Sequence, residues 1–348
     1  MSNISQIDRN FAVESSLNID NIKFYDVREE PFSVYGVFYE NGSFRRMPEE
    51  IAKTVSKKVY NLHVHAAGGR VKFVTNSSYV AIKASMPVIG KMPHFALSGS
   101  AGFDLYTGKR EEYFGSFMPP FDISDGYESV LRFGERKRRE ITINFPLYSS
   151  ISSLYIGLEE DACVKKSAGY KYEKPIGFYG SSITQGGCVC RPGNAYESII
   201  ARNLQTNYFN LGFAGSAKAE DAMAEYISKL DMSVFVYDYD HNAPTLEHLQ
   251  NTHQRMFMTI RNAQPELPIV LLSRPKYMLN GVDKKRLEII RKTYTDALDA
   301  GDKNVYFIEG PTLMKYAKNA GTVDNCHPND LGFYSMAKVL TPLLKTLL

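Results

Sequence analysis

Short apolar runs alternate with longer amphipathic stretches after Pro175, and this alternation constrains the fold more than any other feature of the chain. Apolar runs of this length predict buried strands, and the stretches between them predict helices. The strands are expected at 176–179, 208–213, 234–239, 269–273 and 305–308. The helices are expected at 194–204, 217–229, 246–261, 284–300, 311–317 and from 330 to the end. Such a series predicts an α/β fold with a parallel sheet covered by helices on both faces.

The chain before this region has a different pattern, in which β-branched and aromatic residues alternate with polar ones between Gly, Asn and Pro. Strands are expected at 32–39, 68–75, 79–84, 141–145 and 154–157, with one short helix at 49–56. Many short strands predict a β-sandwich or jelly roll. The polar stretch 165–174 is the expected linker between an N-terminal β-domain at 1–165 and an α/β domain at 174–348.

Composition narrows the classes of function. The chain has 348 residues, room for two domains, and a net charge of +3 with acids and bases nearly balanced. This balance implies no polyanion-binding surface, so we expect no nucleic-acid partner. Residues 1–20 lack the apolar core of a signal peptide, and no apolar run reaches membrane length; a cytoplasmic location without a membrane partner is expected. A homo-oligomer is left open.

The candidate nucleophile lies where an apolar strand ends in the small residues Gly180-Ser181-Ser182. A serine just past a strand can be a nucleophile, because backbone N–H groups crowd around the same turn and can hold an oxyanion. Asp324 and His327 stand near the C-terminus, three residues apart, so that one loop can carry both. These residues follow predicted strands, where parallel sheets bind their ligands.

Two further residues after predicted strands supply candidate donors for an oxyanion. Asn242 offers its side-chain amide, and Gly215 offers a backbone N–H that no side chain shields. Each candidate also has a structural interpretation: Ser182 and Asn242 as helix N-caps, Gly215 as a turn glycine, and Asp324 and His327 as loop residues. Their occurrence together, in this order, favours acyl-transfer chemistry.

The second part of the chain resembles the SGNH hydrolase superfamily, also called GDSL-type esterases and lipases. The resemblance covers residues 175–348 and is carried by four blocks: Gly180–Gly186, Asn210–Gly215, Asn242, and Asp324–Pro328. It implies a flavodoxin-like three-layer sandwich and hydrolysis of esters by a Ser-His-Asp triad.

The same resemblance implies a role for each candidate residue. Ser182 would be the nucleophile, His327 the base and Asp324 the acid that orients it. The oxyanion hole would comprise Ser182, Gly215 and Asn242. No cofactor and no metal are implied.

The first part of the chain more loosely resembles the jelly-roll-like domain that precedes SGNH domains in some two-domain members, through Gly69–Ser77 and Ala101–Tyr106. Members with this architecture are often linked to acylated carbohydrates or to acyl transfer onto small molecules. The chain departs from the family pattern in two places. Ser181 replaces the usual aspartate before the nucleophile, and Tyr-Asp-His-Asn at 239–242 replaces Gly-x-Asn-Asp.

Three functions are therefore carried forward. The first is a serine esterase for short acyl esters, acetyl esters foremost, on a small-molecule or oligosaccharide substrate. The second is an acyltransferase with a small-molecule or sugar acceptor. The third is an inactive carbohydrate-binding protein, suggested by Ser181.

A few other residues invite a ligand hypothesis. His63 and His65 would face the same side of a strand, but a third metal ligand is missing, so packing histidines are favoured. The basic cluster Arg136–Arg139 is expected to be a solvated turn rather than an anion site. A metal site or redox pair is conceivable for three of the four cysteines, but free thiols are favoured: Cys188, Cys190 and Cys326.

Overall fold

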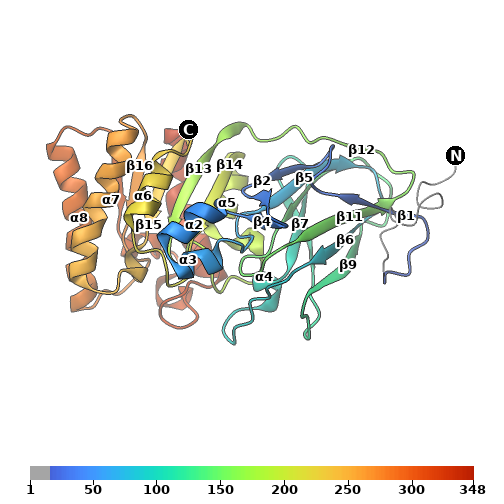
Figure 1. Cartoon of the computed structure of the whole chain (residues 1–348), viewed down its shortest axis with the longest axis horizontal. Coiled ribbons are helices and arrows are strands. Elements are labelled where there is room, and N and C mark those ends of the chain that lie inside the picture. The colour runs from blue at the N-terminus through green and yellow to red at the C-terminus, as the bar shows by residue number, and fades with distance from the viewer. Residues whose placement is uncertain (1–15) are drawn as a thin grey trace.

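The computed structural model describes residues 16–348, in which a β-rich N-terminal part and an α/β C-terminal part lie side by side along the long axis (Figure 1). Residues 1–15 of the expected N-terminal domain lie outside the described residues. Within the described part, every helix is too short or too polar to cross a membrane.

The N-terminal part is built from two antiparallel sheets that pack face to face. One sheet has the order β1 (Ile22–Asp26), β11 (Ser153–Glu159), β6 (Tyr79–Ser85) and β9 (Gly126–Arg132). The other has the order β12 (Val164–Lys165), β5 (Arg70–Thr75), β10 (Arg139–Asn144), β7 (Phe103–Thr107) and β8 (Glu112–Phe117), and β2 (Ser33–Tyr35) pairs with β5. The hairpin β3 (Phe38–Glu40)–β4 (Ser43–Arg45) stands apart. Apolar side chains from both sheets, among them Phe73, Phe103, Ile143 and Ile156, fill the space between them, which confirms the predicted sandwich.

The prediction of a single strand at 32–39 is wrong in one respect, because Gly36 divides this stretch into β2 and β3. Gly36 has φ +74°, a left-handed conformation that favours glycine, and a Cβ there would collide with the Gly68 carbonyl. The chain therefore turns between β2 and β3.

The C-terminal part contains the predicted parallel sheet. Its strand order is β14 (Thr206–Gly212), β13 (Tyr172–Gly180), β15 (Val234–Asp238), β16 (Ile269–Leu272) and β17 (Val305–Ile308), with every neighbouring pair parallel. One face is covered by α5 (Tyr196–Leu204), α9 (Gly310–Leu313) and α10 (Asp330–Leu347). The other is covered by α6 (Asp221–Ser228), α7 (Leu246–Ala263) and α8 (Gly281–Asp299). The α/β fold class predicted from the sequence is confirmed.

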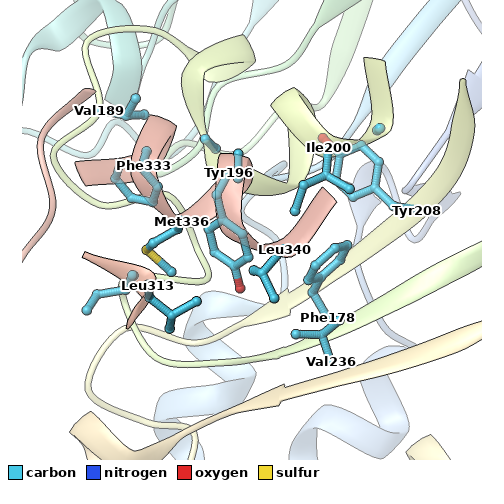
Figure 2. Close-up of a cluster of buried hydrophobic side chains, with 14 of the residues drawn as sticks. Phe178, Val189, Tyr196, Ile200, Tyr208, Val236, Leu313, Phe333, Met336 and Leu340 are labelled. Atoms are coloured by element: carbon cyan, nitrogen blue, oxygen red, sulfur yellow. The ribbon is translucent and has the colours of Figure 1, made fainter. Parts of the chain in front are cut away.

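Successive side chains along each strand point to opposite faces of the sheet and pack alternately into the two cores, as the strand period of two requires. Figure 2 shows the core under α5 and α10, where Phe178 and Val236 of the sheet meet Tyr196, Met336 and Leu340 of the helices. These side chains are almost completely buried. Burial of this apolar surface fixes how the ends of β13 and α10 lie relative to each other.

Two helices of the N-terminal part join the core of the C-terminal part. They are α2 (Glu49–Val55), which confirms the helix expected at 49–56, and α3 (Lys57–Leu62). Ala52 and Val59 are buried in the same cluster as Leu211 of β14 and Phe213, which directly follows that strand, and Figure 1 shows both helices beside α6. A further short helix, α4 (Leu97–Ser100), follows β6 and faces the C-terminal part through Gly99, which approaches Val189.

The N-terminal part also covers β14, which is an edge strand of the parallel sheet. The buried Arg46 donates to the carbonyl oxygens of Asn210 (3.3 Å) and Gly212, and the buried Arg70 donates to that of Tyr208 (3.1 Å). An edge strand presents unpaired carbonyl and N–H groups. The guanidinium groups therefore satisfy acceptors that would otherwise lack partners.

Replacing Arg46 with methionine is expected to lower the free energy of unfolding by about 3 kcal/mol or more, because several buried carbonyls lose their donor. Besides the β14 contacts, Arg46 donates to the oxygens of His65 (2.8 Å) and Leu62 (2.7 Å). Urea unfolding followed by circular dichroism measures the change. The exposed Lys53→Met is the control and should shift stability by no more than about 0.5 kcal/mol. Equal stability of the Arg46 variant and the wild type would show that these hydrogen bonds do not stabilise the fold.

His63 and His65 do not lie on one strand, so the expectation that they face the same side of a strand is wrong. His63 caps the end of α3, and its ring contacts the side chain of Arg45. His65 lies in a loop, with Nδ1 3.0 Å from Gln185 Nε2. Both are buried packing histidines, the interpretation favoured from the sequence. Both ring nitrogens of His63 have partners, the Arg45 side chain and the Tyr60 carbonyl, as buried polar atoms require.

The basic cluster forms the turn before β10. Arg136 pairs with Glu159 (3.1 Å) and Asp161 (2.7 Å), and its side chain is largely solvated. The solvated turn expected from the sequence is therefore observed.

The stretch expected as a linker, 165–174, runs from the end of β12 into β13. Its central Tyr170 is buried, and the hydroxyl accepts a hydrogen bond from Arg70 Nε at 2.5 Å. Ser167 Oγ donates to Glu140 (2.6 Å). The stretch connects the two parts while packing against the sandwich.

Candidate active site

Ser182 lies in the turn that follows β13, an interior strand of the parallel sheet. The turn begins at Gly180, where a Cβ would collide with the Asp238 carbonyl and the Thr184 hydroxyl. Ser181 holds the turn: its N–H donates to Asp238 O (3.1 Å), and its Oγ accepts from Ile183 N (3.2 Å). Ser182 Oγ instead lies 2.9 Å from His327 Nε2. Of the two adjacent serines, the one chosen from the sequence is the one that meets the histidine.

Asp324 and His327 occupy one closed loop just before α10. Asp324 Oδ2 lies 2.8 Å from His327 Nδ1, and Oδ1 accepts from the backbone N–H groups of His327 (2.7 Å) and Cys326 (3.0 Å). The loop is closed by Val323 N–H, which donates to His327 O (2.9 Å), and Asn325 takes a left-handed conformation at its tip. The three-residue spacing thus lets a single carboxylate hold both the backbone and the ring.

The hydrogen bonds fix the ionisation of Asp324. Burial raises its pKa, but the hydrogen bonds from the His327 ring and backbone outweigh burial and hold the pKa at about 2. The carboxylate is therefore charged at neutral pH and accepts a hydrogen bond from the N–H of His327 Nδ1. This leaves Nε2, the atom that faces Ser182, as the hydrogen-bond acceptor.

Ser182, Gly215 and Asn242, which line the same cavity, offer three N–H donors. Asn242 Nδ2 donates one hydrogen to Phe213 O (2.9 Å) and faces the same cavity as Gly215, which has φ +64°. Across residues 16–348, the backbone N–H groups of Ser182 and Gly215 have no hydrogen-bond acceptor. Donors left without partners beside a nucleophile suit an oxyanion.

The helix-cap interpretations of Ser182 and Asn242 are wrong. The segment after Ser182 is a series of turns, and the next α-helix, α5, begins only at Tyr196. Asn242 ends the short 3₁₀ helix Asp240–Asn242, and the cap of α7 is Thr245, whose side chain accepts from His248 N.

A cavity of about 400 Å³ joins these residues, and both parts of the molecule line it. The N-terminal part contributes Met92, His94, Phe95 and Tyr148, none of which the sequence suggested. Tyr148 donates its hydroxyl to Ser182 O (2.9 Å) and packs edge-on against Phe95. These four residues lie in irregular segments without periodicity or motif, so no sequence signal places them here.

Asp104 anchors the loop after the nucleophile turn to the sandwich. The carboxylate is buried on β7, and Oδ2 accepts from Gly193 N (2.8 Å) and from Arg191 Nη1 (3.1 Å). Asn144 donates to the other oxygen at 2.9 Å. The segment Ala101–Tyr106, singled out from the sequence, thus holds the active-site loop in place.

None of the four cysteines forms a disulfide bond in the described residues. Cys188 and Cys326 line the cavity, and Cys190 lies beside it. Burial raises the pKa of Cys188 to about 12 and that of Cys190 to about 11, so both carry their protons at neutral pH.

Comparison with protein families agrees with this geometry. Residues 173–345 match the GDSL-like lipase/acylhydrolase family, and residues 22–164 match the N-terminus of SGNH-hydrolase-type esterases. The two matches adjoin and correspond to the two parts of the structure. The chain belongs to the two-part SGNH-type esterases, and its class is that of an ester hydrolase.

Solved structures with the same architecture include three informative relatives. A protein of Bacteroides ovatus described as a GDSL-like lipase is 28% identical over 94% of this chain and 98% of its own, with a TM-score of 0.85. The salicylyl-acyltransferase SsfX3 of a tetracycline biosynthetic pathway is 17% identical over 95% and 98%, with a TM-score of 0.77. A family two carbohydrate esterase of Cellvibrio japonicus is 13% identical over 94% and 98%, with a TM-score of 0.61. Among proteins of curated function, none matches the chain.

Proposed function

We propose that this protein is a serine esterase that hydrolyses short acyl esters, acetyl esters foremost, on carbohydrate or small-molecule alcohols. The observation that carries the proposal is the hydrogen-bond chain from Ser182 Oγ through His327 to Asp324, at 2.9 Å and 2.8 Å. A nucleophile, a base and an orienting acid in this arrangement are what acyl transfer requires.

In the proposed reaction, Ser182 Oγ attacks the ester carbonyl while His327 Nε2 takes its proton. Asp324 stabilises the resulting imidazolium. The N–H groups of Ser182 and Gly215 and the amide of Asn242 hold the tetrahedral oxyanion. Collapse returns the proton to the departing alcohol, and water then attacks the acyl-enzyme with His327 as base, which releases the carboxylic acid.

The substrate is best identified by comparing acyl groups and alcohols separately. We expect the p-nitrophenyl acetate rate to exceed that of the octanoate ester, and acetylated oligosaccharides to release acetate. One structural relative is an acetyl xylan esterase, at 13% identity, a level that supports the fold alone. A preference for long acyl chains would contradict the proposal.

Replacing Asn242 with alanine is expected to lower kcat by about 10²- to 10³-fold with little change in KM, because the donor acts chiefly on the charged intermediate. Steady-state kinetics with p-nitrophenyl acetate measure both constants. Thr245→Ala is the matched control, since Thr245 caps α7 three residues away. An Asn242 variant with a raised KM and unchanged kcat would place this residue outside the oxyanion hole.

Acyl transfer to an acceptor other than water is a second candidate, favoured by the cavity wall. Met92, Phe95 and Tyr148 from the N-terminal part form an apolar and aromatic side of the cavity, which suits an organic acceptor. One structural relative is an acyltransferase. Product analysis with added sugars and alcohols separates the two: hydrolysis gives free acid, whereas transfer gives a new ester at the expense of acid.

The inactive-protein hypothesis loses its motivation. It arose from Ser181, whose hydrogen bonds go to Asp238 at the end of β15 and to Ile183 in the turn, and which takes no part in the hydrogen-bond chain that links Ser182 to Asp324.

A further inference from the structure

Three metal-ligating side chains meet at the mouth of the cavity. The ligand atoms of His94, Cys188 and His327 all lie within 4.8 Å of one another. They come from three distant segments: a loop of the N-terminal part before α4, the loop after the nucleophile turn, and the loop before α10. Ester hydrolysis as proposed above uses His327 alone of the three.

The donor set suits Zn²⁺. Zinc binds histidine nitrogen at about 2.0–2.1 Å and cysteine sulfur at about 2.3 Å, commonly with three protein ligands and one open position. Tetrahedral ligands around such an ion lie about 3.5 Å apart, so a shift of about an ångström closes the set. His94 is exposed, which leaves its ring free to make that adjustment. The rings of His94 and His327 already lie 5.6 Å apart between centroids.

The surroundings of His327 favour a metal at its Nε2 atom. Asp324 accepts a hydrogen bond from Nδ1 at 2.8 Å, which is the carboxylate–histidine pairing that orients metal-bound histidines. The Nε2 atom carries no proton in this tautomer, and its lone pair faces the Ser182 hydroxyl, 2.9 Å away at the cavity.

The backbone conformation of Cys188 is an independent indication of a functional site. Its backbone has φ +77°, in the left-handed region that non-glycine residues rarely adopt. Such conformations persist at functional sites, where the surrounding structure holds them. The side chain is buried at the cavity wall rather than exposed, so its sulfur faces the other two ligands.

We propose that His94, Cys188 and His327 form a zinc site that inhibits the enzyme reversibly. On binding, the Cys188 thiol releases its proton to solvent, and the ion takes the Nε2 lone pair that must accept the proton of Ser182. The ion also ties the N-terminal part to the catalytic loops across the cavity mouth. The inhibition rests on the proposed esterase function; the binding does not.

Binding is tested without reference to activity. Chelator-treated full-length protein is titrated with Zn²⁺ by calorimetry and with Co²⁺ by absorption spectroscopy. We expect one ion per chain and a thiolate-to-cobalt charge-transfer band. The band should vanish in Cys188→Ala. In His94→Gln the affinity for Zn²⁺ should fall by about 10- to 100-fold or more, because losing a ligand costs at least as much as losing a residue that supports a ligand. Cys163→Ser, at an exposed cysteine far from the site, should bind as the wild type does.

Inhibition is tested with p-nitrophenyl acetate, each variant being compared with its own zinc-free rate. The rate of the wild type should fall when zinc is added and recover with EDTA. His94→Gln should need at least about tenfold more zinc for the same inhibition. A band unchanged by Cys188→Ala, or the absence of one-to-one binding, overturns the site. Binding without inhibition overturns the regulatory role. If the wild type hydrolyses no ester, the esterase proposal fails. The metal site is still tested by the cobalt band, which should also appear in Ser182→Ala because it does not depend on activity.

Discussion

Ser182→Ala is expected to lower kcat for p-nitrophenyl acetate by about 10³-fold or more, because the acyl-enzyme cannot form without the hydroxyl. Ser182 Oγ lies 2.9 Å from His327 Nε2, and this is the contact through which the proposed mechanism activates the serine. A fluorophosphonate probe followed by peptide mass spectrometry gives a second readout, in which the label should be found on Ser182.

Ser181→Ala is the matched control one residue away. Its hydroxyl accepts a hydrogen bond from Ile183 N within the turn and does not reach the histidine, so its loss should leave the probe reaction intact. If the Ser182 variant kept its rate, or the label appeared on Ser181, the assignment of the nucleophile would be wrong.

Asp324→Asn is expected to lower kcat by about 10⁴-fold while leaving the fold intact. The carboxylate of Asp324, whose pKa is about 2, stays charged throughout the usual assay range and holds the proton on His327 Nδ1. An amide in its place stabilises the tautomer with the proton on Nε2, which can no longer accept the proton of Ser182. Steady-state kinetics at neutral pH, together with a circular dichroism spectrum, test this.

Asp330→Asn serves as the control, because Asp330 lies three residues after His327 and binds Asn194 and the Cys190 N–H instead of the ring. A loss of less than about tenfold in Asp324→Asn would show that another group orients the histidine.

The α/β part was largely readable from the sequence. Strands such as 305–308 are short runs of β-branched and aromatic residues bounded by polar residues, a pattern that favours a strand over a helix. Ser182, Asp324 and His327 were recognisable because each lies in a short block whose chemistry depends on local spacing. The hydrogen bonds of the Asp324 loop are an example, since all of them close within five residues.

The sandwich was less predictable, and so was its share of the cavity. The strands β8 and β9 mix charged residues and glycine with aromatic ones, and their burial does not alternate: the first three residues of β8 are all exposed, and most of β9 is half-buried. His94 and Tyr148 reach the site only because the two parts dock. That docking depends on buried contacts such as Arg46 on β14 and Asp104 on the loop at 191–193, which join residues far apart in the chain.

The covering of β14 has a consequence for dissecting the molecule. Cut away from the sandwich, the catalytic half would display a bare row of hydrogen-bonding groups along one side, a template on which other polypeptides can add as strands. A truncated hydrolase would then be prone to aggregate, and it would also lack one wall of the active-site cavity. Truncation therefore gives a poor account of what the first half does, and point substitutions in the full-length chain are the better tool.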